Sequence, residues 1–326
     1  KTAIYKVLTM PNTSHQKSPL PGLQVLFRAL QKIGVHTTHP DSLKEKYASN
    51  HSQYTTIDGT VIHYQDEGEG PVLILSHGVM ASLHTWDGWV DILKAKYRII
   101  RFDIPGFGLS DPNASKQFNP EYTITLFNGF VDALGIDKFY LVGNSLGGFI
   151  SWNYAATHPE RVEKLILIDP IGYEQKLPTV MKLVTLPIIQ SIARWIAPKF
   201  IVDSSVRKVY GQPDNIHHTV FDRYFDLLSH PGGRDAMVDV FLTFKHFNGH
   251  PEVTTKMKSL SMPTLVMWGE EDAWVPVAHA SNWKRDVPQA ETIIYKNAGH
   301  IPMEEFPEKT AIDADRFLSQ LNAVTD

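Results

Sequence analysis

Gly143-Asn144-Ser145-Leu146-Gly147 stands between the run Lys138 to Val142 and the segment Phe149 to His158. The run before it is short, apolar and aromatic, which predicts a buried strand. The segment after it predicts a helix that stops before Pro159. In this context the pattern G-x-S-x-G predicts a sharp, strained turn that presents Ser145 as a nucleophile. Its glycines permit the tight turn and the close approach of strand and helix.

A serine nucleophile needs a histidine base, and the histidine needs a carboxylate that fixes its tautomer. Two later stretches supply candidates, because the predicted strand Pro263 to Trp268 runs into Asp272, and the predicted strand Thr292 to Tyr295 runs into His300. The carboxyl ends of parallel strands form the edge at which ligands bind. We therefore expect Asp272 and His300 to meet Ser145 through the fold.

Each of these residues has an alternative interpretation. Ser145 also fits a helix N-cap, a position at which serine is common. Asp272 also fits a solvated loop acid, and two glutamates precede it directly. Asp169 is its nearest rival as the acid, because it also follows a predicted strand; it precedes a proline, however, and equally fits the cap of a turn.

The loop after an early predicted strand, Val72 to Ser76, completes the candidate site. An oxyanion hole needs two backbone N–H groups aimed at the developing negative charge. We predict that Leu146, the residue after the serine, supplies one of them and that Val79 supplies the other. The side chain of His77, before Val79, is expected to be structural. Asp103, which ends another strand, is expected to organise a loop.

Four segments taken together resemble the α/β-hydrolases, and the likeness covers roughly residues 54–321. The segments are His77-Gly78, Asp103 to Ser110, Gly143 to Gly148 and Gly299 to Glu304. The resemblance implies an α/β fold with a mostly parallel central sheet flanked by helices, a Ser-His-Asp triad, and a variable cap over the site. The matching triad positions are Ser145, Asp272 and His300. The substrate stays open, because this fold hosts many chemistries.

The succession of predicted elements divides the chain into three parts. Residues 1–53 form an N-terminal arm, and residues 54–171 and 260–326 form the core. In the core, a hairpin around Asp58-Gly59 precedes strands that alternate with helices, which predicts right-handed crossovers and a parallel sheet. The alternation stops in residues 172–259, which are helical in pattern and rich in aromatic residues. Their position matches that of a helical cap.

The cap is expected to wall the substrate pocket. Four apolar cap residues are our candidates for its lining: Met181, Leu183, Ile188 and Trp195. An apolar lid suits an acyl chain or an aromatic acid rather than a highly charged substrate.

Composition excludes several classes of function. The 326 residues carry a formal net charge of -4, which argues against a nucleic-acid partner. The chain has no cysteine, so it has neither a disulfide nor a thiol nucleophile. The histidines are scattered without metal-binding spacing, and no glycine loop cradles a phosphate. We therefore expect no metal and no cofactor. No apolar run is long enough to span a membrane.

The arm differs in charge from the rest of the chain. Residues 1–53 hold seven Lys or Arg and two Asp or Glu, a net charge of +5. Apolar residues from Leu23 to Ile33 recur at helical spacing and predict an amphipathic helix. Two interpretations stay open, a helix packed on the body and a helix that contacts a membrane surface. Because the chain begins at Lys1, we expect that an upstream segment is missing. The compartment and the oligomeric state stay open.

These features predict a serine hydrolase that acts on a small carboxylic ester with an apolar acyl or aromatic part. An aspartate-nucleophile mechanism is disfavoured because the elbow residue is Ser145. The same triad also serves carbon–carbon bond hydrolases, lactonases and cofactor-free perhydrolases. From other classes come a non-catalytic ligand receptor on the same fold and a membrane-surface scaffold led by the arm.

Overall fold

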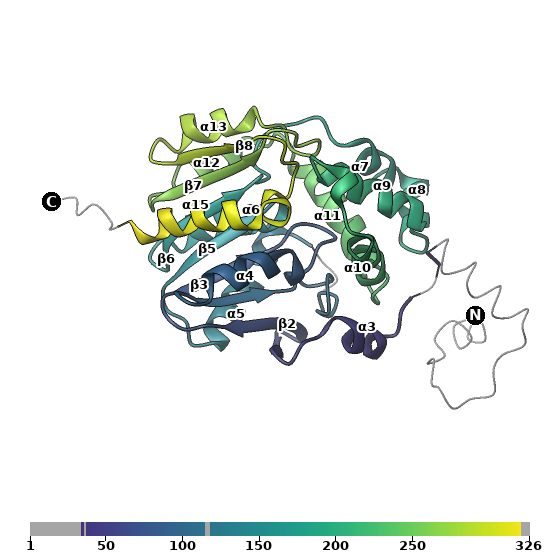
Figure 1. Cartoon of the computed structure of the whole chain (residues 1–326). Helices are drawn as coiled ribbons and strands as arrows, with labels where there is room; N and C mark the ends of the chain where they lie inside the picture. The colour runs from purple at the N-terminus through teal and green to yellow at the C-terminus, as the bar shows by residue number, and fades with distance from the viewer. Residues whose placement is uncertain (1–33, 36, 115–117, 321–326) are drawn as a thin grey trace, which may run out of the picture.

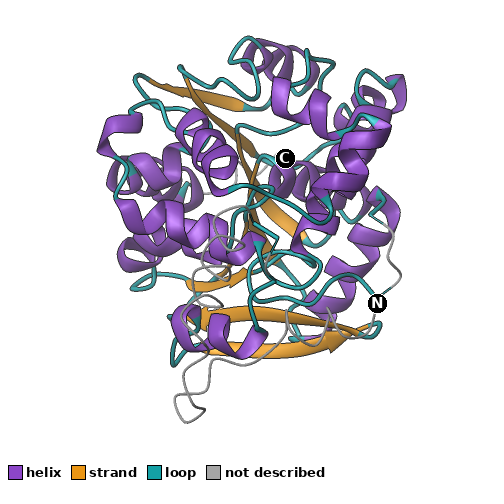
Figure 2. Ribbon diagram, turned by 90° about the vertical axis from the view of Figure 1, so that its right-hand side faces the viewer, coloured by secondary structure: helices purple, strands orange, loops and turns teal. Residues whose placement is uncertain are grey.

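A central sheet of eight strands organises the chain (Figures 1 and 2). The computed structural model describes residues 34, 35, 37–114 and 118–320; the predicted arm helix lies outside them. The strand order is β1-β2-β4-β3-β5-β6-β7-β8. The strands are β1 (Ser52–Ile57), β2 (Thr60–Glu67), β3 (Val72–Ser76), β4 (Arg98–Phe102), β5 (Phe139–Asn144), β6 (Val162–Ile168), β7 (Thr264–Gly269) and β8 (Glu291–Tyr295).

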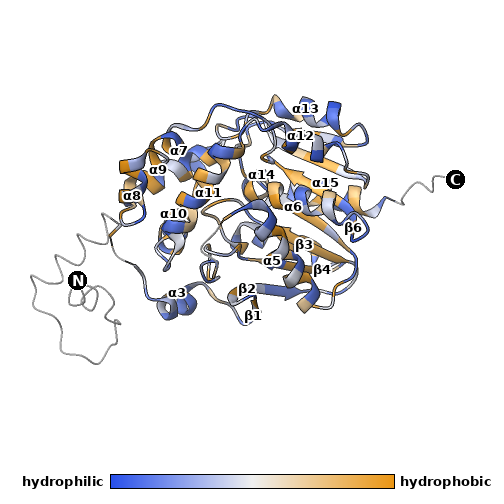
Figure 3. Ribbon diagram, turned by 180° about the vertical axis from the view of Figure 1, so that it is seen from behind, coloured by the Kyte–Doolittle hydropathy of each residue, from blue (hydrophilic) through white to orange (hydrophobic). Residues whose placement is uncertain are grey.

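The first two strands are antiparallel to their neighbours, and the remaining pairs run parallel. The parallel strands read as near-continuous hydrophobic runs because both faces of the sheet are covered. Every residue of β7 is buried, for example. Figure 3 shows this difference in hydropathy, with hydrophobic strands inside and more polar helices outside. The mostly parallel α/β sheet expected from the sequence is confirmed.

The hairpin at the start of the core is also confirmed. Ile57 pairs with Thr60 across the turn. Asp58 and Gly59 have φ values of 47° and 74°. Two successive positive φ angles match the right-handed twist of the strands, which explains the Asp-Gly pair.

Helices cover the sheet in two layers. One face carries α4 (Asp87–Leu93), α14 (Pro302–Glu305) and α15 (Pro307–Ser319). The other carries α5 (Pro120–Ala133), α6 (Leu146–Thr157), α12 (Pro251–Met257) and α13 (His279–Asp286). The helical segment before β4 starts with the 3-10 turn η1 (Leu83–Trp86) and continues as α4. The two faces are separate hydrophobic clusters, so the central strands β3 and β5 to β7 are buried almost throughout, whereas the edge strands β1 and β8 keep exposed residues.

Further helices lie between β6 and β7, in the range predicted for the cap. They are α7 (Thr179–Val184), α8 (Pro187–Ala193), α9 (Lys199–Val209), η2 (Pro213–Asn215), α10 (His218–Leu228) and α11 (Gly233–Phe247), followed by α12. Figure 1 shows α7 to α11 gathered at one end of the sheet. We call α7 to α11 the cap helices and retain residues 172–259 as the proposed cap.

The described part of the arm packs on the body. Helix α3 (Pro40–Tyr47) buries Leu43 against Leu109 and Leu227. The side chains of Lys46 and Tyr47 each contact a carboxylate oxygen of Asp226 on α10 at 2.7 Å. Residues 40–47 of the arm are therefore packed on the body, whereas the two interpretations of the helix predicted from Leu23 to Ile33 stay open, because that helix lies outside the described residues. Among the described residues, no helix combines the length and the apolar character needed to cross a bilayer.

Helix α6 meets β3 at a backbone-to-backbone contact. A Cβ atom on Gly147 would lie 2.3 Å from the carbonyl oxygen of Ser76 and 2.5 Å from that of His77. Because a real Cβ atom does not come so close to a carbonyl, only glycine lets the helix start here. This contact sets the position of the first turn of α6.

We expect Gly147→Ala to lower the free energy of unfolding by about 3 kcal/mol, the upper end of the range for overpacking, because both partners are backbone atoms. Urea unfolding followed by circular dichroism measures it. Gly135→Ala is the control, since no atom lies within 4 Å of a Cβ there and only its φ of 66° is strained. A left-handed alanine costs about 1–2 kcal/mol. Equal losses in the two variants would contradict the contact argument.

Candidate active site

Ser145 lies at the turn between β5 and α6 with a strained backbone. Its φ and ψ are 54° and -113°, and its side chain is 3% exposed. The Ser145 N–H donates to the carbonyl of Ile168 at 3.0 Å, and its carbonyl accepts from the N–H of Phe149 at 2.9 Å. A non-glycine residue in this conformation persists only where its surroundings hold it. The turn has the geometry of the predicted nucleophile elbow.

Asp272 and His300 are brought together as predicted. The His300 Nδ1 and Asp272 Oδ2 atoms are 2.7 Å apart. The other carboxylate oxygen of Asp272 accepts from the N–H groups of Trp274 at 2.7 Å and Val275 at 2.9 Å. The two glutamates before Asp272 are exposed, whereas its own carboxylate is buried. These contacts favour Asp272 as the acid over its neighbours, because an acid held by three donors keeps the imidazole in one orientation.

The loop that carries His300 is held from three sides. The backbone N–H of His300 donates to the carbonyl of Val209 at the end of α9, at 2.7 Å. Its carbonyl accepts from the side-chain amide of Asn144, next to the nucleophile, at 2.9 Å. Glu305 accepts from the N–H groups of Gly299 at 2.6 Å and Gly211 at 2.8 Å. Sequence reasoning missed Asn144 and Glu305, although both lie next to residues that it singled out.

The two predicted oxyanion donors lie beside the serine. Val79 lines a small cavity of about 40 Å³ together with Ser145 and His300. Leu146 is the first residue of α6. Within the described residues, neither backbone N–H donates a hydrogen bond to a protein acceptor. Free donors at these two places fit an oxyanion hole, which we retain as a proposal.

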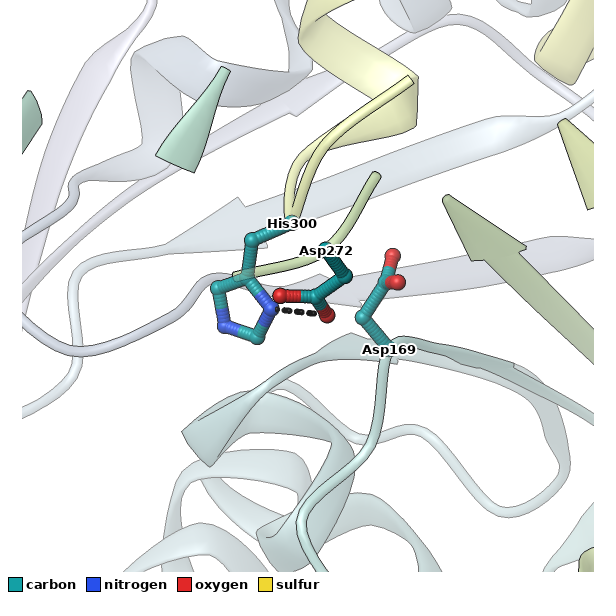
Figure 4. A group of neighbouring side chains, drawn as sticks. All are labelled: Asp169, Asp272 and His300. Atoms are coloured by element: carbon teal, nitrogen blue, oxygen red, sulfur yellow. Dashed lines mark hydrogen bonds and ion pairs between the residues drawn. The ribbon is translucent and has the colours of Figure 1, made fainter. Parts of the chain in front are cut away.

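Asp169, the rival acid, lies on the far side of Asp272 from His300 (Figure 4). It is fully buried, and its Oδ1 accepts from the N–H of Gly269 at 2.9 Å. Its Oδ2 has no hydrogen-bond partner in the described part of the chain. Burial, and next the charge of Asp272, raise the pKa of Asp169 well above its ordinary value. The raised pKa favours the neutral form of Asp169, next to the Asp272 carboxylate that contacts His300.

Asp169, Asp272 and His300 offer ligand atoms within 4.8 Å of one another, a set that a cation could use. Two features fit a metal poorly. The Nδ1 atom of His300 is already hydrogen-bonded to Asp272. The raised pKa of Asp169 favours the protonated carboxyl, which is a poor metal ligand. We therefore interpret the cluster as acid, base and a buried neutral neighbour.

His77 and Asp103 have the structural roles expected of them. His77 Nδ1–H donates to the Gly78 carbonyl at 2.7 Å, and its Nε2 accepts from the Ile104 N–H at 2.9 Å. Burial lowers the pKa of His77, which favours this neutral form. Asp103 accepts from backbone N–H groups of two loops, at Leu83 and Leu109. Burial alone would raise its pKa, but histidines in contact lower it to about 2.

The four predicted cap contacts need correction. None lines either of the two cavities near Ser145. Met181 is buried elsewhere, while Leu183, Ile188 and Trp195 are 48%, 77% and 69% exposed. Other side chains of α7, α8 and α9 line the larger cavity instead. The predicted lining is therefore wrong for all four residues, because these short helices are apolar on several sides and their sequence does not show which side faces the cavity.

That larger cavity, of about 220 Å³, lies within the cap helices. Its walls are Met80, Val180, Val184, Ile189, Ile192, Ala193, Ile196, Ala197, Pro198, Ile201, Val202, Ser205, Leu228, Met237, Phe241 and Trp274. It shares Met80, Ser205 and Trp274 with the cavity at Ser145. The Trp274 ring also stacks on His300, with ring centroids 6.4 Å apart. An apolar chamber therefore adjoins the reactive residues.

Comparison with known proteins gives a consistent family. The model of the alpha/beta hydrolase fold matches residues 71–195 and 202–307. A hydrolase of Comamonas testosteroni, named for 2-hydroxy-6-oxononadienedioate and 2-hydroxy-6-oxononatrienedioate, is 31% identical over 255 residues, 73% of this chain and 84% of that protein. It is one of several similar hydrolases of this name.

Solved structures share the fold. A thermophilic esterase from Thermogutta terrifontis superposes with a TM-score of 0.70 at 25% identity, covering 82% of this chain and 97% of its own. A bacterial membrane phospholipase A superposes with a TM-score of 0.69 at 24% identity, covering 91% of this chain and 90% of its own.

We expect Ser145→Ala to lower turnover of a p-nitrophenyl ester by on the order of 10⁶, as removal of a nucleophile does. Asp272→Asn should lower it by about 10⁴ through the wrong imidazole tautomer. Asp169→Asn should change it little, because an amide resembles a neutral carboxyl. Steady-state kinetics on folded variants measures all three. A larger loss in Asp169→Asn than in Asp272→Asn would move the acid to β6.

Asp169→Asn should also change how stability depends on pH. The unfolded chain releases the proton of Asp169 above the ordinary pKa of 3.8, whereas the folded chain keeps it. The wild-type protein therefore loses stability as pH rises from that value towards the raised folded pKa. The Asn variant has no such proton. The Tm of Asp169→Asn minus the Tm of the wild-type protein should therefore increase from pH 4 to pH 8. A constant or shrinking difference would mean that Asp169 is ionised in the folded protein.

Proposed function

The chain belongs to the α/β-hydrolase fold family, and on that premise we propose that it is a serine hydrolase of carboxylic esters with an apolar acyl part. That it is a hydrolase follows from the family and its relatives. The ester is our proposal, and one observation carries it. The apolar cavity of about 220 Å³ shares walls with the pocket of Ser145.

In this proposal the Ser145 Oγ atom attacks the ester carbonyl while His300 Nε2 accepts the proton of the Ser145 hydroxyl. Asp272, bonded to Nδ1, stabilises the imidazolium. The N–H groups of Val79 and Leu146 hold the oxyanion of the tetrahedral intermediate. The intermediate expels the alcohol, which receives the proton from His300, and leaves an acyl group on Ser145. Water, deprotonated by His300, then attacks this acyl-enzyme and releases the acid.

The cavity supports an apolar acyl chain by its size and by its lining. In the part of the chain that the structure describes, Ser205 is the only wall residue with a hydroxyl, and no wall residue is charged. A dry apolar cavity of about 150 Å³ binds benzene, so this one has room for at least roughly six carbons. Burying each methylene there contributes about 0.8 kcal/mol to binding. The esterase of similar fold is consistent with this reaction class.

A carbon–carbon bond hydrolase is the second candidate, supported by the Comamonas testosteroni relative. The substrate in that protein's name is a dicarboxylate. Burying a carboxylate is costly unless a cation or several donors pair with it. Among the described residues, none of those that line the two cavities is Lys or Arg. This lining favours the ester over a doubly charged substrate.

A substrate panel tests the choice. We expect kcat/KM for p-nitrophenyl esters to rise from the acetyl to the octanoyl ester, and 2-hydroxy-6-oxononadienedioate to be turned over poorly. The Ser145→Ala variant provides the background rate for both. Faster turnover of the dienedioate than of every ester would establish the second candidate and reject ours.

Filling the cavity should change the preference for acyl length. Ala193 lies in its wall and is 8% exposed. We expect Ala193→Phe to lower the ratio of octanoyl to acetyl kcat/KM by on the order of tenfold or more, because discrimination by a hydrophobic pocket is worth about 1–3 kcal/mol per methylene. The ratio serves as its own control for folding and for the triad. An unchanged ratio would place the acyl chain outside this cavity.

A further inference from the structure

The outer side of the cap helices exposes a concentration of large hydrophobic side chains. Of eleven such exposed residues in the described chain, seven fall between residues 183 and 201. They are Leu183, Leu186, Ile188, Ile192, Trp195, Phe200 and Ile201, which we call the cap surface. The most exposed are Ile188 at 77%, Phe200 at 71% and Trp195 at 69%. Figure 3 shows hydrophobic colour along α8 and α9 at this end of the molecule. Such a concentration marks an interaction site.

A longer stretch that contains the cap surface is positively charged. Residues 176–208 contain six Lys or Arg and one Asp, a net charge of +5. Since the whole chain is -4, the remaining residues sum to -9. Arg194 pairs with Asp235 and Asp239, and Lys199 pairs with Asp203 and Asp222. The basic residues of this stretch that have no ion pair in the described part of the chain lie towards its two ends and are Lys176, Lys182, Arg207 and Lys208.

We propose that the cap surface docks on an anionic lipid surface. Apolar and aromatic side chains flanked by Lys and Arg are the combination that inserts into the boundary between headgroups and acyl chains. Basic residues near such a surface are attracted to it, and salt screens the attraction. The acidic remainder of the chain is repelled, so the charge distribution orients the cap towards the lipid.

The cap surface is continuous with the cavity of the proposed function. Ile192 and Ile201 belong to the cavity walls and are 50% and 41% exposed on the outside. A docked cap thus brings the cavity wall to the level of the acyl chains. This second part, the delivery of an acyl ester from the lipid to Ser145, rests on the proposed function. The docking itself does not.

The arm is another possible occupant, because it joins the body here. The Gly34 carbonyl accepts from the Ala197 N–H at 3.3 Å, between α8 and α9. Residues 1–33, however, contain five Lys or Arg and no Asp or Glu, a net charge of +5. The arm and residues 176–208 therefore carry charge of the same sign, and so would the cap surfaces of two copies. Because like charges repel, the two segments do not attract each other, and both are attracted to an anionic surface.

Absence of cysteine in the chain allows a direct test of contact. Phe200→Cys in the full-length protein is labelled with a polarity-sensitive fluorophore, and Ile312→Cys on α15 is the matched control at an exposed isoleucine. Vesicles of phosphatidylglycerol with phosphatidylcholine should shift the emission of the label at 200 to the blue, and the label at 312 should not respond. A label at 200 that is already blue-shifted without vesicles would show the arm or a second copy on the cap surface and overturn the proposal.

Cosedimentation with the same vesicles measures affinity. The double variant W195S/F200S should bind on the order of tenfold more weakly than the wild-type protein, and I312S should bind like it. Lys182→Glu should weaken binding and Lys138→Glu, an exposed lysine before β5, should not. Binding should fall in high salt and on pure phosphatidylcholine. Wild-type affinity in W195S/F200S, or equal loss in the matched controls, would overturn the proposal.

Docking and chemistry are separated by two further measurements. Ser145→Ala should bind vesicles like the wild-type protein, because binding needs no turnover. W195S/F200S should hydrolyse a soluble short ester like the wild-type protein but lose activity on an ester presented in anionic vesicles. If no ester is hydrolysed at all while the vesicle results hold, the proposed function fails and the docking stands. If soluble esters are hydrolysed and no variant changes vesicle binding, the docking fails alone.

Discussion

The backbone of Ser145 is the constraint on which the remainder of the site depends. A non-glycine residue at a φ of 54° costs on the order of 1–3 kcal/mol, so the surrounding structure must hold it there. Part of that support is the hydrogen bond to Ile168 on the neighbouring strand. Another part is the approach of Gly147 to the backbone of β3, which no other residue permits. Together they hold Ser145 in the wall of the small cavity, at the start of α6, while β5 and β6 behind it are almost entirely buried.

The base depends on the cap as well as on the core. The loop of His300 is bonded to Val209 in α9 and to Asn144 in the elbow, so it connects the two parts of the molecule. A second connection lies close by, where Arg223 and Tyr224 of α10 contact Glu304 of α14. Burial alone would lower the pKa of Arg223, but Glu304 raises it, which keeps this buried pair charged. The cap helices therefore position the catalytic histidine that we propose, in addition to shaping the cavity. A lid that moved freely would not preserve this geometry.

Charge is distributed at two scales. Around the proposed base, burial raises the pKa of Asp169 and favours its neutral form, while the Asp272 carboxylate lies in contact with a ring nitrogen that is protonated in an imidazolium. Over the whole chain, the positive charge of residues 176–208 stands against an acidic remainder. This second pattern coincides with exposed apolar side chains and with the wall of an apolar cavity. The cap surface is proposed to dock on an anionic lipid surface, and an ester with an apolar acyl chain, the proposed substrate, would be present in that lipid.

The positions of the turn at Ser145 and of the Asp272–His300 contact could be predicted from sequence because each depends on local chemistry: G-x-S-x-G between strand and helix, and polar residues directly after buried strands. The parallel sheet followed from the alternation of strands and helices. The lining of the cavity could not be predicted. Helix α8, Pro187–Ala193, is apolar around most of its circumference, so periodicity selects no face, and Ile189 lines the cavity while Ile188 is exposed. The contacts of Asn144 and Glu305 and the raised pKa of Asp169 could not be predicted from sequence either, because they arise from segments far apart in the chain. Sequence determines which residues can react; packing between distant segments decides which of them meet and which side chains reach water.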